Sequence, residues 1–274
     1  MNGGRGTADD VPADDLAADD VPADDLATDD VPADDVPTDD LPADDVPADE
    51  VVEALRDVAR LGGFFALDTV RGLASGSGSG SGFGEERLTR EGFAARARTV
   101  NERYGTAEAR IGVSIAHLGL AARLWSPVLA CALVHGIVPV MTTVEWAGDG
   151  SALRLSGPRG SRVPRSGASP AYAVAAQTDG VLQRVESHLP VKMAPRLLAG
   201  NSASALAGSA AQLLRSRPGL RAPLTALTRE LLETGRLRGT GRITGPELTF
   251  RRRSCCLYYR APNGSKCGDC CLAR

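Results

Sequence analysis

The chain has 274 residues, enough for one large domain or two small ones. Residues 1–50 hold seventeen Asp, one Glu and one Arg, a net charge of −17, whereas the other 30 Lys and Arg and 16 Asp and Glu give a net charge of +14. The net charge of −3 is therefore the sum of an acidic tail and a basic body, so the charge is spread unevenly along the chain.

Residues 9–48 repeat the pentapeptide Asp-Asp-Val/Leu-Pro/Ala-Ala/Thr eight times, and six repeats carry Pro. Pro breaks helices, paired aspartates repel one another and the apolar content is thin, so we expect a disordered acidic tail over residues 1–48. It could serve as a docking arm or shield the basic body, or be an expanded repeat that aids solubility. The first residues lead into aspartates instead of an apolar segment, which indicates no signal peptide and a cytoplasmic protein.

The pattern predicts a helical substrate domain over residues 49–245. Apolar residues recur at helical spacing from Val51 to Leu61, and a Ser-Gly repeat at 75–82 predicts a flexible linker. Residues 85–110 predict a polar helix, and residues 111–134 a long apolar helix broken near Pro127. The most apolar stretch, 124–140, is too short to span a membrane comfortably and contains two prolines.

The second half of this domain begins with a small β element. Residues 138–146 predict a strand, 148–150 a turn, 152–156 a short return strand and 157–169 a loop. Helices follow at 171–189, 196–215 and 224–234, and glycines then mark a loose passage into the last segment, 246–274. The expected fold class is mainly α (α+β), with a small β-hairpin or sheet and a C-terminal four-cysteine segment.

Several residues that often carry chemistry have simpler structural interpretations in this sequence. Cys131 lies in an apolar run and is expected to be a small buried hydrophobe. His117 and His135 are expected to be hydrogen-bonded core histidines, and Trp125 a core residue. Asn201 stands in a helical pattern, where it is expected to cap or cross-link helices. No glycine-rich phosphate loop follows a strand, so no nucleotide or flavin site is predicted.

Five of the six cysteines lie in the last twenty residues, in the spacing C-C-x10-C-x2-C with one further cysteine directly after. Four thiolates can hold Zn²⁺ or an iron–sulfur cluster. Adjacent cysteines tend to point apart, which favours a two-iron [2Fe–2S] centre over a single zinc ion while leaving zinc open. In a reducing compartment such a cluster of cysteines favours metal over disulfides.

The segment from Arg252 to Arg260, with Cys267-Gly268-Asp269-Cys270, resembles the C-terminal [2Fe–2S] signature of the FhuF-type ferric-siderophore reductases. Residues 118–127 and 197–205 resemble the same family, so the resemblance extends from about Val51 to the C-terminus. It implies one-electron reduction of ferric iron in a hydroxamate-type siderophore, with release of Fe²⁺ in the cytoplasm. It also implies four cluster ligands: Cys255, Cys256, Cys267 and Cys270.

Cys271 departs from the family pattern, and its role stays open. The implied partners are a ferric hydroxamate and an electron donor such as a ferredoxin-like protein or a flavin reductase. The sequence predicts no nucleic-acid binding and no membrane span, and it leaves peripheral membrane association open. The alternative is a four-cysteine zinc module without redox activity. A siderophore-synthetase relative is disfavoured because no nucleotide-binding part is present.

Overall fold

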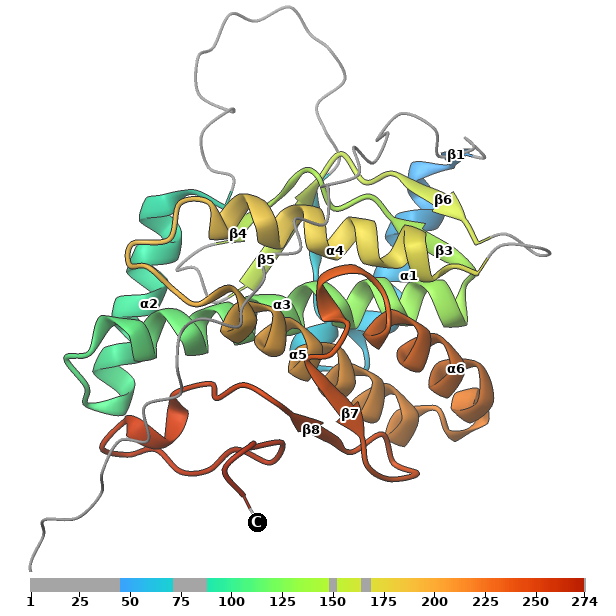
Figure 1. Ribbon diagram of the computed structural model, residues 1–274. Helices are drawn as coiled ribbons and strands as arrows, with labels where there is room; N and C mark the ends of the chain where they lie inside the picture. The colour runs from blue at the N-terminus through green and yellow to red at the C-terminus, as the bar shows by residue number, and fades with distance from the viewer. Residues whose placement is uncertain (1–44, 71–87, 148–151, 164–168, 274) are drawn as a thin grey trace, which may run out of the picture. The chain divides into compact units, whose positions relative to one another are not determined.

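A 26-residue helix, α3 (Ala109–Val134), runs through the middle of the structure, and the other elements pack around it (Figure 1). This computed structural model describes residues 45–70, 88–147, 152–163 and 169–273. The acidic repeat up to residue 44, the Ser-Gly linker at 75–82 and the turn expected at 148–150 lie outside the described residues. Apolar side chains surround α3 on most of its circumference, which is typical of a helix buried on all sides.

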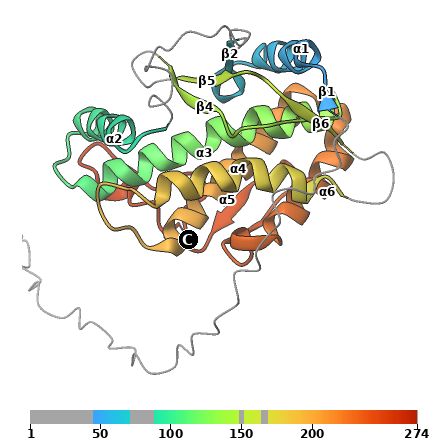
Figure 2. The same ribbon diagram turned by 90° about the horizontal axis from the view of Figure 1, so that it is seen from above.

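Five further α-helices are described, and they cover both flanks of α3. Helix α5 runs along α3 in the same direction and makes the largest helix contact with it, and α4 lies beside α3 on the side opposite β4 and β5 (Figure 2). Their bounds are α1 (Ala48–Ala59), α2 (Arg90–Tyr104), α4 (Ala171–Glu186), α5 (Pro195–Ser216) and α6 (Arg221–Leu232).

The described strands form three small sheets. In the first, β6 pairs antiparallel with both β1 and β3, and in the second β5 pairs antiparallel with β4 and parallel with β2. The third is the antiparallel hairpin β7–β8. Their bounds are β1 (Asp45–Val46), β2 (Asp68–Val70), β3 (Ile137–Pro139), β4 (Val144–Ala147), β5 (Ala152–Ser156), β6 (Gly160–Arg162), β7 (Gly241–Ile243) and β8 (Phe250–Arg252).

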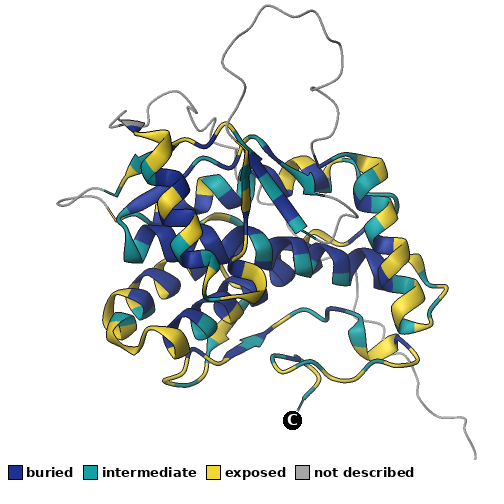
Figure 3. Cartoon of the chain, turned by 180° about the vertical axis from the view of Figure 1, so that it is seen from behind, coloured by how far each residue is buried: buried dark blue, intermediate teal, exposed yellow. Residues whose placement is uncertain are grey.

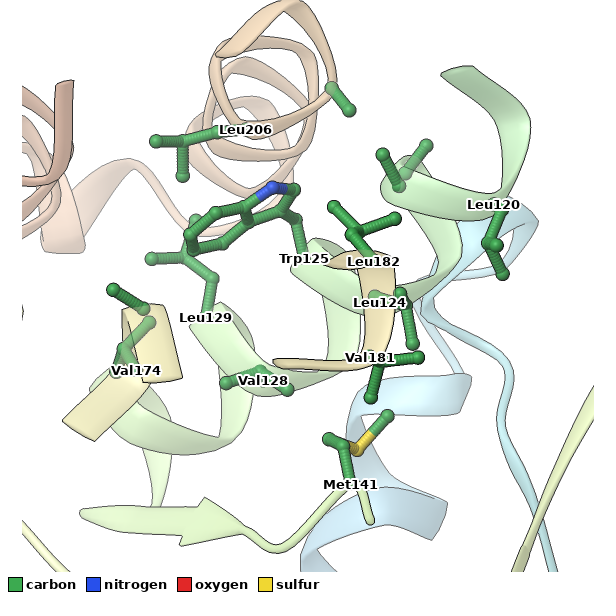
Figure 4. Packing of buried hydrophobic residues seen from close by; sticks show 14 of the residues in the cluster. Leu120, Leu124, Trp125, Val128, Leu129, Met141, Val174, Val181, Leu182 and Leu206 are labelled. Carbon is green, nitrogen blue, oxygen red and sulfur yellow. The ribbon is translucent and has the colours of Figure 1, made fainter. Parts of the chain in front are cut away.

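The core is centred on Trp125, whose indole ring is fully buried between α3 and α5 (Figure 4). Leu129, Leu206 and Val174 are buried around it from three different helices. The indole N–H donates a hydrogen bond of 3.0 Å to Ser202 Oγ, so its polar atom is satisfied. The expectation that Trp125 belongs to the core is confirmed.

The predicted helices are present, and most of their ends lie within three residues of those expected. The polar helix expected over residues 85–110 is shorter, since α2 spans Arg90–Tyr104. The helix predicted from Val51 begins at Ala48, because its first turn accepts Asp49 and Glu50 near the positive end of the helix dipole. The break predicted at Pro127 is wrong, since α3 continues through it. Proline removes one backbone donor, but this part of α3 is packed on several sides, and tertiary contacts hold it helical.

Two strand predictions also need correction. The single strand expected over residues 138–146 is two strands, β3 and β4, which belong to different sheets. Within the loop expected at 157–169, Gly160–Arg162 form β6, the central strand of its sheet. A Cβ at Gly160 would lie 3.1 Å from the Val138 carbonyl oxygen, so glycine permits the close approach of β6 to β3.

Helix α3 is also the one described helix long and apolar enough to cross a membrane by length and composition. Of its most apolar window, 72% is buried inside the fold, as in the core helix of a globular protein.

Candidate iron–sulfur site

The cysteine segment follows β8 and lies on the side of α3 and α5 away from the sheets formed by β1 to β6 (Figure 1). The hairpin β7–β8 packs against α5, and the short 3-10 helix at Tyr258–Arg260 packs against α3. The segment has no long helix or strand of its own after Arg252, so side-chain contacts to the two core helices hold it in place.

A buried polar network joins these two helices to the segment. The hydroxyl of Ser114, on α3, donates to the carbonyl oxygen of Cys256 at 2.8 Å. Asn201, on α5, donates through Nδ2 to the Ser114 carbonyl at 2.9 Å and accepts from Arg252 Nη2 at 2.8 Å. Three chain segments far apart in sequence therefore meet at one asparagine, which confirms its expected cross-linking role.

The helix surface under the segment is shaped for close approach. A Cβ on Gly200 would overlap the Ser254 hydroxyl and lie 3.0 Å from Arg252 Nη2, so any larger residue would push the segment off α5. Ser204, about one helical turn further along α5, donates from its hydroxyl to the carboxylate of Asp269, inside the second half of the motif. Both halves of the cysteine motif are thereby fastened to the same face of α5.

The structure brings two of the four predicted ligands, one from each half of the motif, into contact. Cys256 Sγ and Cys267 Sγ lie 3.5 Å apart, although eleven positions separate them in sequence. Cys255 Sγ accepts the backbone N–H of Leu257 at 3.3 Å, and Cys270 Sγ accepts that of Leu272 at 3.4 Å. Backbone N–H groups aimed at sulfur stabilise thiolates and, in iron–sulfur proteins, raise the reduction potential.

The backbone turns sharply between Cys256 and Tyr258. Leu257 adopts the left-handed conformation with φ of 66°, which is uncommon for a residue with a side chain. Tyr258 then packs edge-on against Tyr104 of α2, with ring centroids 5.2 Å apart.

The side chains of Cys256 and Cys267 are hydrogen-bonded to each other. This hydrogen bond lowers the pKa of Cys256 to about 6. The same bond raises the pKa of Cys267. Burial raises the pKa of Cys255, with the neighbouring thiols Cys256, Cys271 and Cys270 adding to the effect. Metal binding takes thiolates, so the site releases protons as it fills.

Arg252 is the strongest sign that a negatively charged group belongs at this place. Its guanidinium is fully buried, and its Nε and Nη1 atoms have no hydrogen-bond partner. No carboxylate pairs with it among the residues that the structure describes. Its charge is close enough to lower the pKa of Cys256. A buried cation without a counter-ion is costly, and a thiolate-ligated cluster with net negative charge supplies one.

The donor set therefore fits a [2Fe–2S] cluster, in which each iron takes two thiolates. In the described parts of the chain, no three His, Cys, Asp or Glu side chains gather tightly enough to hold one metal ion. The pair of Cys256 and Cys267 has the close spacing of two sulfurs on one iron. Cys255 and Cys267 are partly exposed, whereas Cys256 and Cys270 are buried, so the site lies at the surface but is anchored from beneath (Figure 3).

The remaining cysteines differ in their surroundings. Cys131 is fully buried in the core away from the motif, and burial raises its pKa to about 12, which confirms it as a structural residue. Cys271 lies beside the motif, and Arg251 donates to its carbonyl oxygen at 3.4 Å. Arg251 also donates to the carbonyl of Ala273. Arg251 thus holds the residues after Cys270 next to the motif.

The histidines stand away from the motif, as expected. His117 is fully buried and its Nε2 lies 2.8 Å from a carboxylate oxygen of Glu186, so the prediction of a hydrogen-bonded core histidine is confirmed for it. His135 is only partly buried and contacts Asp57 at 3.1 Å. Sequence reasoning did not find Ser114, Ser204 or the role of Arg252, because their contacts span more than fifty positions and leave no local pattern.

Comparison with known protein families gives a match for the cysteine segment. Residues 252–272 match the family model described as FhuF 2Fe-2S C-terminal domain. Comparisons with curated proteins and with solved structures give no match. The matched range begins at the buried arginine and includes all five clustered cysteines. The C-terminal segment thus matches a [2Fe–2S] domain of the FhuF type, which agrees with the cofactor expected from the cysteine spacing.

Proposed function

We propose that the protein is a cytoplasmic ferric-siderophore reductase that transfers one electron to Fe³⁺ held in a hydroxamate-type siderophore. The observation that carries the proposal is the FhuF-type [2Fe–2S] domain with partly exposed Cys255 and Cys267. The iron–sulfur centre supplies a store for one electron when it is bound. Ligands Cys255, Cys256, Cys267 and Cys270 are proposed to hold it.

The chemistry of the substrate explains why one electron suffices. Hydroxamates bind Fe³⁺ through hard, anionic oxygens, and Fe²⁺ has a lower charge density and binds the same oxygens far more weakly. A reduced donor protein, ferredoxin-like or flavin-bearing, gives up one electron. The ferric chelate accepts one electron and becomes ferrous. Protons then replace the metal on the hydroxamate oxygens as Fe²⁺ leaves.

The residues of this chain support that transfer in three ways. The Arg252 guanidinium offsets the negative charge of the thiolates from beneath, in a buried setting where Coulomb interactions are strong. Ser114 and Asn201 hold the segment rigid, which limits rearrangement on electron transfer. The exposed side of the motif leaves Cys255 and Cys267 accessible to a large chelate and to a donor protein.

The proposal is tested by anaerobic purification of the full chain, with analysis of metal and acid-labile sulfide. Expected are iron and sulfide in equal amounts and a visible spectrum that dithionite bleaches. Addition of a ferric trihydroxamate should restore the oxidised spectrum. Stoichiometric zinc without sulfide would instead identify the alternative, a zinc module, and would contradict the proposal.

A further inference from the structure

A cavity of about 620 Å³ opens directly beside the cysteine segment. Its walls come from four places: the end of α4, the start of α5, the passage from Arg236 to Thr240 and the residues after β8. The backbone N–H of Arg253 donates to the Thr240 carbonyl at 2.8 Å, which ties two of these walls together. The volume is within the range of small-ligand sites, roughly 300–1,000 Å³.

The cavity adjoins the site at Cys255. Ser254 lines it, and the next residue is the first ligand proposed for the iron–sulfur centre. Consecutive Cα atoms are about 3.8 Å apart, so the backbone of Cys255 directly follows the part of the wall that Ser254 forms. The rate of electron transfer falls steeply with distance. A substrate bound in this cavity would therefore have a short path from the iron–sulfur centre proposed at Cys255.

The charge of the walls is strongly one-sided. Four arginines line the cavity with a single carboxylate, that of Glu186. Glu186 is already paired with Arg236 at 2.8 Å and lies 2.8 Å from His117. The other three arginines have no carboxylate partner among the described residues: Arg196, Arg238 and Arg253.

These three guanidinium groups come from different elements yet face one space. Arg196 stands in the first turn of α5, where a cation is unfavourable for the helix dipole. Arg238 donates only to a backbone carbonyl, that of Glu233, at 3.0 Å. Repulsion among them is relieved by an anion that enters between them, and guanidinium is the group that best recognises carboxylates.

We propose that this cavity is the chelate-binding site and that it selects ferric hydroxamates with net negative charge, such as those whose backbone carries free carboxylates. The inference rests on the proposed reductase function and names its substrate class. The iron-binding hydroxamates face Ser254 and Cys255, and the carboxylates meet Arg196 and Arg238.

Binding is tested separately from reduction with gallium complexes, because Ga³⁺ has nearly the size of Fe³⁺ and does not accept the electron. The probe is one linear trihydroxamate with its terminal amine free, acetylated or succinylated, which gives a cationic, a neutral and an anionic complex. Calorimetric titration of the full chain should show the anionic complex binding about tenfold more tightly than the cationic one. The preference should shrink as salt is added.

The double variant R196Q/R238Q should bring the three affinities within about twofold of one another while the visible spectrum and melting temperature stay unchanged. The control R56Q/R229Q removes two exposed arginines outside the cavity and should keep the full preference. Equal affinity of the three complexes for the wild-type protein, preference for the cation, or an absence of binding would each overturn the inference.

Reoxidation of the dithionite-reduced protein by the three ferric complexes separates this inference from the proposed function. Rates in the order anionic, neutral, cationic support both. Equal rates for the three contradict the charge selection and leave the reductase function standing. Binding in the expected order without any reoxidation contradicts the reductase function and keeps the cavity as a chelate site.

Discussion

Nη2 of Arg252 donates a hydrogen bond of 2.8 Å to Oδ1 of Asn201, and this single buried contact links α5 to the strand that leads into the cysteines. The same amide donates to Ser114 on α3, and Ser114 donates to the carbonyl of Cys256. The core helices, which carry no cluster ligand, therefore determine where the cysteine segment sits.

Substitution of Asn201 should loosen that segment. Asn201→Ala leaves the Ser114 carbonyl without this bond and Arg252 without its closest acceptor, and each buried orphan costs about 1–3 kcal/mol. Urea unfolding should show that the free energy of unfolding of the variant is lower by about that amount. The variant should also lose iron during gel filtration. Asn263→Ala, at an exposed asparagine within the cysteine segment, should behave as wild type. Equal stability of the two variants would contradict the role of Asn201.

Arg252 is expected to set the reduction potential. Arg252→Met removes a buried positive charge of similar volume, so the reduced, more negative state loses stabilisation and the potential falls. Arg252→Lys keeps the charge and should give a smaller fall. Redox titration measures both, with Arg253→Met as the control at an exposed neighbour, where solvent screens the charge. A potential that moves equally in Arg252→Met and Arg253→Met would show that the burial of Arg252 is irrelevant.

Cysteine variants test the ligand set. Cys256→Ser and Cys267→Ser should abolish iron and sulfide content, because these sulfurs form the closest pair. Cys131→Ala should keep full content, since Cys131 is buried in the core away from the motif. Cys271→Ser should also keep it if Cys270 is the fourth ligand. Loss of the cluster in Cys271→Ser together with its retention in Cys270→Ser would reverse that assignment.

The helices could be predicted from sequence because apolar periodicity is local. Val51 to Leu61 carries it plainly, whereas the stretch around Trp125 is a long apolar run of helix-forming length; both helices are present. Strand β6 could not be predicted, since Gly160-Ser161-Arg162 has no alternation and is held by pairing with β1 and β3. The continuity of α3 through Pro127 likewise depends on tertiary packing, which outweighs the local preference.

The candidate site could also be predicted only in part from the sequence. The spacing of Cys255, Cys256, Cys267 and Cys270 marks the motif in the sequence, and the structure brings the halves together at Cys256 and Cys267. The counter-charge could not be assigned from sequence, because five basic residues crowd the motif and only the fold shows that Arg252 is buried. Asn201 stands out in sequence as polar in a helix, but its partners become visible only in three dimensions.

Asp179 should make stability depend on pH. Burial raises its pKa from 3.8 to about 6, and one of its oxygens is buried without a partner. The folded state thus holds this proton more tightly than the unfolded state does, so the contribution of Asp179 is most favourable below pH 4 and is lost as pH rises toward 6. The loss amounts to at most about 3 kcal/mol.

Asp179→Asn should therefore be more stable than wild type at pH 7.5, and the difference should shrink at pH 5. Glu186 has a lowered pKa because it bonds to His117 and Arg236, which offset its burial, and its contribution is lost only as pH falls below about 4.5, outside this range. Urea unfolding at the two pH values checks the sign. Glu53→Gln, at an exposed carboxylate, serves as the control. An Asp179→Asn protein that is less stable at pH 7.5 would contradict the assignment.

The most direct test of the account is a single turnover under anaerobic conditions. Dithionite-reduced protein, freed of excess reductant, is mixed with a ferric trihydroxamate in the presence of a coloured Fe²⁺ chelator. The account predicts one Fe²⁺ released for each cluster reoxidised, and no release with the Cys256→Ser protein. Reoxidation without Fe²⁺, or Fe²⁺ release that is the same with the Cys256→Ser protein, would contradict it.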